Sequence, residues 1–141
     1  MDSATAMSGA ALLLRIATGV VFVAHGVPKL LREREGVKVG RRRLVESITQ
    51  LGFPWPEAWA WAVGVLQGAG GVLLLLGLFT PWVAAALAVV MAVAAYKQSP
   101  EGFVLAADFP FALLCVLLAL VLLGDGRFSV AALFGRSGDL P

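Results

Sequence analysis

The sequence contains little charge. Charged residues make up 14% of its 141 residues, whereas hydrophobic residues make up 60%. Soluble domains have about 25% charged and about 45–50% apolar residues. A soluble fold of this length has too little interior to hide so many apolar side chains. We therefore exclude an ordinary soluble enzyme and predict that the chain is embedded in a lipid bilayer.

Metal ligands and nucleophiles are also scarce. The chain has one cysteine, Cys115, and one histidine, His25. One thiol forms no disulfide within the chain, and this pair alone is too few for the usual zinc sites. A glycine-rich phosphate loop and a nucleophile elbow are missing too. We expect no metal site and neither hydrolase nor metalloenzyme activity, while activity of another kind stays open.

Long apolar segments dominate what is present. A helix needs about 20 residues to cross the hydrocarbon core, and lipid-exposed backbone must satisfy its own hydrogen bonds. The sequence therefore predicts one all-α domain, a polytopic bundle of four transmembrane helices. The spans are expected at about residues 10–31, 57–79, 81–97 and 104–124. The Thr80-Pro81 break makes the second and third spans a helical hairpin.

The first loop is long and basic. Its basic residues are Lys29, Arg32, Arg34, Lys38, Arg41, Arg42 and Arg43, and the third loop adds Lys97. The positive-inside rule then places these two loops in the cytoplasm and both termini outside the plasma membrane. A basic cluster beside a membrane helix suits anionic lipid headgroups and requires no nucleic acid. Apolar residues at helical spacing also predict a short amphipathic helix on the membrane surface, over about residues 41–52.

Polar residues follow one face of the first span. Arg15, Thr18, Phe22, His25 and Lys29 recur at steps of three and four. A charge facing lipid costs several kcal/mol, so this face is expected to point into the bundle. The ordinary alternative is that these groups anchor helices to one another. A lone histidine such as His25 is as often a packing hydrogen bond as a proton carrier.

Further ionisable groups are predicted to gather at the cytoplasmic end. Asp108 is an acid within an apolar stretch and should lie near His25, with Lys29 or Lys97 neutralising it. The candidate ligand-binding residues are His25, Lys29, Gln67, Tyr96, Lys97 and Asp108. A structural ion pair that locks the bundle is an equally open interpretation.

Two other features point to packing. Arg15 lies at the opposite end from Asp108, so Asp125 is its expected structural partner. The amide of Gln67 should point inward, as the floor of any site. Gly64, Gly68 and Gly71 form a face of small residues in the second span, which favours close helix packing within the chain or between copies.

Four stretches carry a resemblance to a known family. They are residues 14–30, with Leu14-Arg15, His25-Gly26 and Lys29-Leu30, then Leu51-Gly52-Phe53-Pro54, residues 70–80, and Gly124-Asp125-Gly126-Arg127-Phe128-Ser129. In order and spacing, the chain resembles the DoxX family of small membrane proteins. It departs at Gln67 and Asp108, where the family often has glutamate. Losing the charge at position 67 argues against a carboxylate-pair mechanism.

The resemblance implies a four-helix membrane protein, and some relatives are subunits of quinone-linked oxidoreductases. We therefore expect an accessory or quinone-interacting subunit of a membrane oxidoreductase system. A soluble oxidoreductase and further copies of this chain are its expected partners. His25 would hydrogen-bond a quinone oxygen and Asp108 would orient the histidine, with Tyr96 nearby. The alternatives are a non-catalytic scaffold that recruits a protein to the basic loop, and a transporter of small lipophilic solutes.

Overall fold

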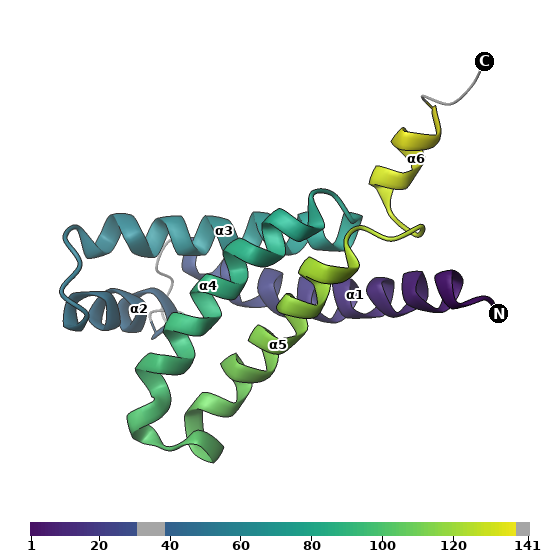
Figure 1. The fold of residues 1–141 in the computed structure, drawn as a ribbon. Coiled ribbons are helices and arrows are strands. Elements are labelled where there is room, and N and C mark those ends of the chain that lie inside the picture. The colour runs from purple at the N-terminus through teal and green to yellow at the C-terminus, as the bar shows by residue number, and fades with distance from the viewer. Residues whose placement is uncertain (31–38, 138–141) are drawn as a thin grey trace.

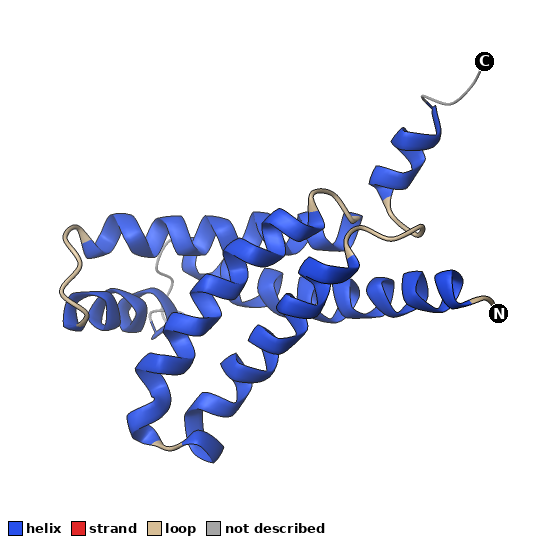
Figure 2. Ribbon diagram, in the orientation of Figure 1, coloured by secondary structure: helices blue, strands red, loops and turns tan. Residues whose placement is uncertain are grey.

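The computed structural model describes residues 1–30 and 39–137, and these residues form helices joined by short turns (Figures 1 and 2). The α-helices are α1 (Ser3–Leu30), α2 (Val39–Gln50), α3 (Pro56–Leu76), α4 (Thr80–Gln98), α5 (Asp108–Leu123) and α6 (Val130–Ser137). A 3-10 turn, η1 (Ser99–Glu101), and a π-helical turn, η2 (Phe103–Ala107), connect α4 to α5. The described part contains no strand, in agreement with the predicted all-α class.

Within the described residues, three helical segments are long and apolar enough to cross a membrane: Ser3–Leu30, Pro56–Leu76 and Thr80–Glu101. The fourth apolar helix, α5, has 16 residues and directly continues η2. The first segment begins earlier than predicted from hydrophobicity. Asp2 Oδ1 accepts a hydrogen bond from Thr5 N at 3.1 Å, which satisfies a free amide of the first turn and extends α1 to Ser3.

Glycines bring α1 and α3 into backbone contact, and this pair has the most extensive helix–helix packing in the fold. A Cβ atom added to Gly26 would lie 2.3 Å from the backbone nitrogen of Gly68. One added to Gly71 would lie 2.8 Å from the carbonyl oxygen of Gly19. The small-residue face predicted for the second span therefore packs within this chain.

Helices α4 and α5 form an antiparallel pair that runs obliquely across α1 and α3 (Figure 1). Large side chains from all four helices fill the space between the two pairs. The fully buried apolar ones are Phe22, Leu74, Leu87, Leu117 and Leu120. Many other large apolar side chains stay exposed, Leu13 at 70% and Leu122 at 88% among them. Exposed apolar surface on this scale is suited to contact with lipid tails.

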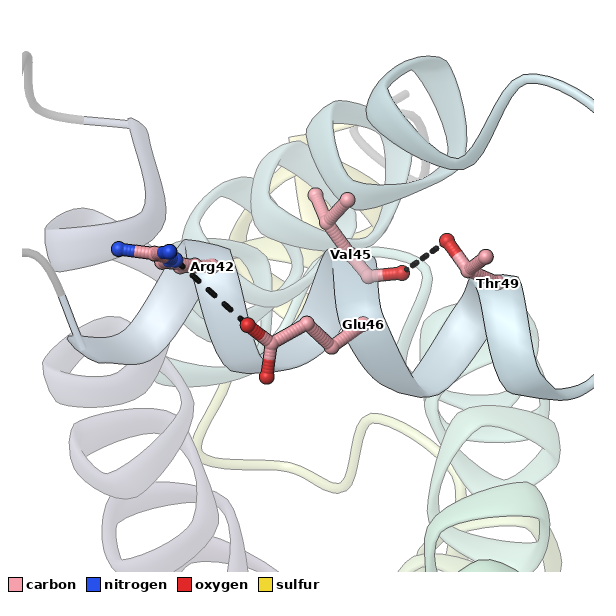
Figure 3. Close-up of polar contacts among 4 residues, drawn as sticks. All are labelled: Arg42, Val45, Glu46 and Thr49. Atoms are coloured by element: carbon pink, nitrogen blue, oxygen red, sulfur yellow. Dashed lines mark hydrogen bonds and ion pairs between the residues drawn. The ribbon is translucent and has the colours of Figure 1, made fainter.

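Helix α2 lies beside the beginning of α3 (Figure 1). Its outer side is polar: Arg42 Nε lies 3.5 Å from Glu46 Oε1, and Thr49 Oγ1 donates to the Val45 carbonyl at 2.8 Å (Figure 3). Exposed ion pairs of this kind contribute at most about 1 kcal/mol. Its position therefore depends on the opposite side of the helix, which carries its apolar residues.

That apolar side faces the protein. Ile48 is buried, and Leu44 and Leu51 line a cavity of the bundle. The apolar side of α2, which the sequence predicted to contact the membrane surface, thus packs partly against the protein. An interfacial position for α2 stays a prediction. The predicted basic residues Arg32, Arg34 and Lys38 lie outside the described residues.

Helix α6 was not anticipated from the sequence. Ser129 Oγ accepts a hydrogen bond from Ala132 N at 3.1 Å, which caps its first turn. A serine directly before an apolar run is a recognisable helix start, and this signal in residues 129–134 was available.

Candidate functional site

A cavity of about 780 Å³ lies between α1, α2, α3, α4 and the beginning of α5. Cavities of about 300–1,000 Å³ typically hold small organic ligands. Its walls are mainly apolar, with Phe22, Val90 and Leu113 among the lining residues. The polar residues in its lining come chiefly from α1, α2, α3 and α4: His25, Lys29, Arg43, Ser47, Gln67, Lys97 and Gln98. The cavity is therefore an apolar space bordered by a few polar groups.

His25 reaches the cavity with one ring nitrogen engaged. Its Nδ1 lies 2.8 Å from the Val21 carbonyl oxygen, one turn earlier in α1. A carbonyl only accepts, so Nδ1 is assigned as the donor, and in the neutral form of the ring Nε2 then holds the lone pair. Nε2 has no hydrogen-bond partner among the described residues. The ring packs near Phe109 of α5, with 6.0 Å between ring centroids.

Lys29 and Gln67 join α1 to α3 at the cavity. Lys29 Nζ donates a hydrogen bond to Gln67 Oε1. Gln67 is only 4% exposed, as expected for an inward-pointing amide, and Lys29 is half-buried. Two of the three ammonium N–H donors of Lys29 remain for another acceptor.

Lys97 connects α4 to α2 across the same cavity. Its Nζ donates to Gln50 Oε1 at 2.5 Å. Arg43 lines the cavity from α2, and its exposed side chain makes no ion pair with any described residue. The amphipathic helix of the first loop thus supplies one wall of the cavity, a role that sequence reasoning did not assign to Arg43 or Ser47.

Asp108 and Tyr96 do not line the cavity. Asp108 is exposed, and its Oδ1 accepts a hydrogen bond from Phe109 N at 2.7 Å. The expected neutralisation of this acid by Lys29 or Lys97 is wrong, because neither lysine forms an ion pair with it in the described part of the chain, and each donates to a glutamine. The carboxylate thus belongs to the first residue of α5 and binds the backbone amide of the next residue. Tyr96 is 75% exposed.

Arg15 holds the opposite end of the bundle together. It is 1% exposed, and its Nε donates to the Leu74 carbonyl at 3.0 Å. Its two terminal nitrogens donate to the carbonyls of Asp125 and Phe128, the latter at 2.8 Å. One guanidinium thereby ties α1 to the end of α3 and to the loop after α5.

The sequence predicted that Arg15 and Asp125 are structural partners. The structure places them in contact, but through different atoms. The guanidinium binds the backbone carbonyl of Asp125, and the carboxylate accepts a hydrogen bond from Thr80 N at 2.8 Å. The predicted pairing of the Arg15 guanidinium with the Asp125 carboxylate is thus replaced by two separate contacts. Thr80 opens α4, whose first amides lack helical partners, so the carboxylate acts as a side-chain cap from another segment.

Long apolar helices, a pair of helices in backbone contact and a cavity bordered by polar groups define a helical membrane protein. The chain belongs to the DoxX family, because residues 10–99 match that family. The match covers most of α1 and all of α2, α3 and α4, whereas α5 and the Gly124–Ser129 stretch lie beyond it. Neither a curated protein nor a solved structure gave a match to this chain.

Proposed function

We propose that this DoxX protein binds a quinone in the cavity and acts as an accessory subunit of a membrane oxidoreductase. The observation that carries the proposal is His25, whose Nε2 is unpartnered among the described residues while its ring borders an apolar cavity. Quinones have a ring with two acceptor oxygens and an apolar tail, and the lining offers N–H donors on Lys29 and apolar side chains. The reduced quinol adds hydroxyl donors, which His25 Nε2 is able to accept.

The roles of Lys29 and His25 in binding would follow from the hydrogen bonds that each is able to form. A bound quinone would supply two-electron, two-proton redox chemistry. The free N–H donors of Lys29 suit a quinone oxygen, and neutral His25 Nε2 accepts a hydrogen bond from a quinol hydroxyl. The contact between His25 Nδ1 and the Val21 carbonyl fixes the tautomer that leaves Nε2 available for proton exchange.

The His25→Ala variant should lose affinity for the reduced form, the quinol, because His25 Nε2 accepts a hydrogen bond from a quinol hydroxyl. Removing one hydrogen bond to a buried ligand group is expected to weaken binding about tenfold. Binding is measured as the thermal shift of the detergent-solubilised protein on titration with a short-chain quinol under reducing conditions. The matched control is Asp108→Ala, which removes an exposed ionisable group of the same region that does not line the cavity, and should bind as the wild type does.

Lipid extraction of the purified protein provides an independent readout. A quinone in the extract supports the proposal. An extract without quinone, together with no thermal shift at saturating quinone, would overturn it. The non-catalytic scaffold that recruits a soluble partner would then be the better assignment.

We also propose that η2 and α5 together form a fourth span in the plasma membrane, with both termini outside. Supporting this, they are contiguous and apolar, and the basic residues Arg41, Arg42, Arg43 and Lys97 lie at one end of the helices while α6 lies at the other. The excess of basic residues places that end in the cytoplasm.

Cysteine labelling tests this topology. In a Cys115→Ser background, a membrane-impermeant maleimide should label the Arg127→Cys variant on intact cells. The Arg42→Cys variant should be labelled only after permeabilisation, since three spans separate the two exposed positions. Labelling of both positions from the same side would show that α5 does not cross the membrane.

A further inference from the structure

The lining of the cavity has more positive than negative side chains. Lys29, Arg43 and Lys97 line it, and Glu101 is the one carboxylate among the described lining residues. The single ion pair in residues 1–30 and 39–137, Arg42 with Glu46, lies on the outer side of α2. None of the three lining cations is therefore paired with a described carboxylate.

Of these three cations, Lys29 has the strongest requirement for a compensating anion. It is half-buried beside an apolar space, and its described partner is the neutral amide of Gln67. A buried cation is costly unless an anion compensates it, and an amide dipole supplies only part of that compensation. Lysines near helix ends usually turn their ammonium toward the headgroups. Here Nζ turns instead to an amide that is 4% exposed, at the cavity.

We propose that the cavity binds a single-chain amphiphile with an acidic head, of the long-chain carboxylate class. Its carboxylate would accept hydrogen bonds from Lys29 Nζ, while Arg43 and Lys97 add long-range attraction. The chain would lie along the apolar wall that contains Phe22, Val90 and Leu113. A cavity of about 780 Å³ suits one chain better than the two chains of a phospholipid.

Two ligands with the same hydrocarbon chain, one charged and one neutral, test the proposal. The wild-type protein in neutral detergent is titrated with a long-chain fatty acid and with its methyl ester, and complexes are counted by native mass spectrometry. The acid is expected to bind at one molecule per chain, about tenfold or more tighter than the ester, because a charge-assisted hydrogen bond is lost in the ester. Equal affinities for the two compounds would overturn the proposal.

Variants locate the site. The Lys29→Gln variant should bind the acid about tenfold more weakly, whereas Lys29→Arg should retain binding because it keeps the charge. The matched control is Arg42→Gln, which removes an exposed cation outside the cavity and should leave affinity unchanged. An equal loss in Arg42→Gln and Lys29→Gln would show non-specific attraction and would contradict the assignment. If Lys29→Gln fails to fold, the acid–ester comparison on the wild-type protein still tests the proposal.

The third ligand to be titrated is an anionic two-chain phospholipid. Tighter binding of this lipid than of the fatty acid would assign the cavity to the bilayer's own acidic lipids and overturn the single-chain proposal. The inference rests on the cavity and its charges and does not depend on quinone binding. Fatty acid binding without quinone binding would remove the proposed function alone, and the reverse result would remove this inference alone.

Discussion

Replacing Arg15 with leucine should destabilise the protein by about 3–5 kcal/mol, because three hydrogen bonds from a charged donor, each contributing about 1.5–3 kcal/mol, are lost, while removing the buried charge offsets part of that sum. The guanidinium donates to three carbonyls that belong to different segments: Leu74, Asp125 and Phe128. Leucine fills similar space but donates nothing. The carbonyls of Asp125 and Phe128 would lose the hydrogen bonds from Arg15, and an unsatisfied buried acceptor costs about 1–3 kcal/mol.

Unfolding in mixed micelles of increasing denaturing detergent measures this loss, and limited proteolysis reports where it acts. The loop of residues 124–129 should become the earliest cleavage site, because Arg15 contributes two of its attachments to the helices. Arg15→Lys should recover little stability, since one ammonium has no fork to reach three separated carbonyls.

Arg127→Leu is the matched control. Arg127 is a second arginine at the same end of the bundle, and its side chain is exposed. Its backbone N–H contact with Ser8 does not depend on the side chain. Surface substitutions of this kind change stability by about 0.5 kcal/mol or less. Similar losses for Arg15→Leu and Arg127→Leu would mean that the buried network does not hold the bundle.

Replacing Gly26 with alanine should force α1 and α3 apart. The added methyl group would lie 2.3 Å from the Gly68 nitrogen and 2.8 Å from its Cα. Both atoms are backbone, so no side chain can rotate away, and the helices themselves must move. Overpacking a tight interface costs about 1–3 kcal/mol and more where the structure cannot relax. We expect a loss at or above the upper end of that range.

The comparison with Gly9→Ala isolates the effect of contact from that of helix propensity. Gly9 lies in the same helix, and a methyl group there meets nothing within 4 Å. Since alanine is the better helix former, Gly9→Ala should be neutral or stabilising by about 0.5–1 kcal/mol. Thermal unfolding of both variants in one detergent makes the comparison. A Gly26→Ala protein as stable as Gly9→Ala would contradict the backbone contact.

The candidate site was predictable where helical spacing controls position. The step of three and four residues places His25 and Lys29 on the face of α1 that borders the cavity, and the cost of a buried amide places Gln67 inward. Asp108 and Tyr96 were grouped with them because they share one end of the bundle. Sharing an end does not determine which way a side chain points, and both lie outside the cavity lining.

By itself the sequence determined a helical membrane protein of the DoxX family, because long apolar runs and local motifs are readable without knowing which helix packs on which. The tertiary structure decided which groups the polar side chains bind. Lys29 meets Gln67 instead of Asp108, and Arg15 binds carbonyls instead of a carboxylate. These choices depend on how far each helix is rotated and how closely it approaches its neighbours. Close glycine contacts between α1 and α3 set that approach, and sequence spacing along a single helix does not contain it.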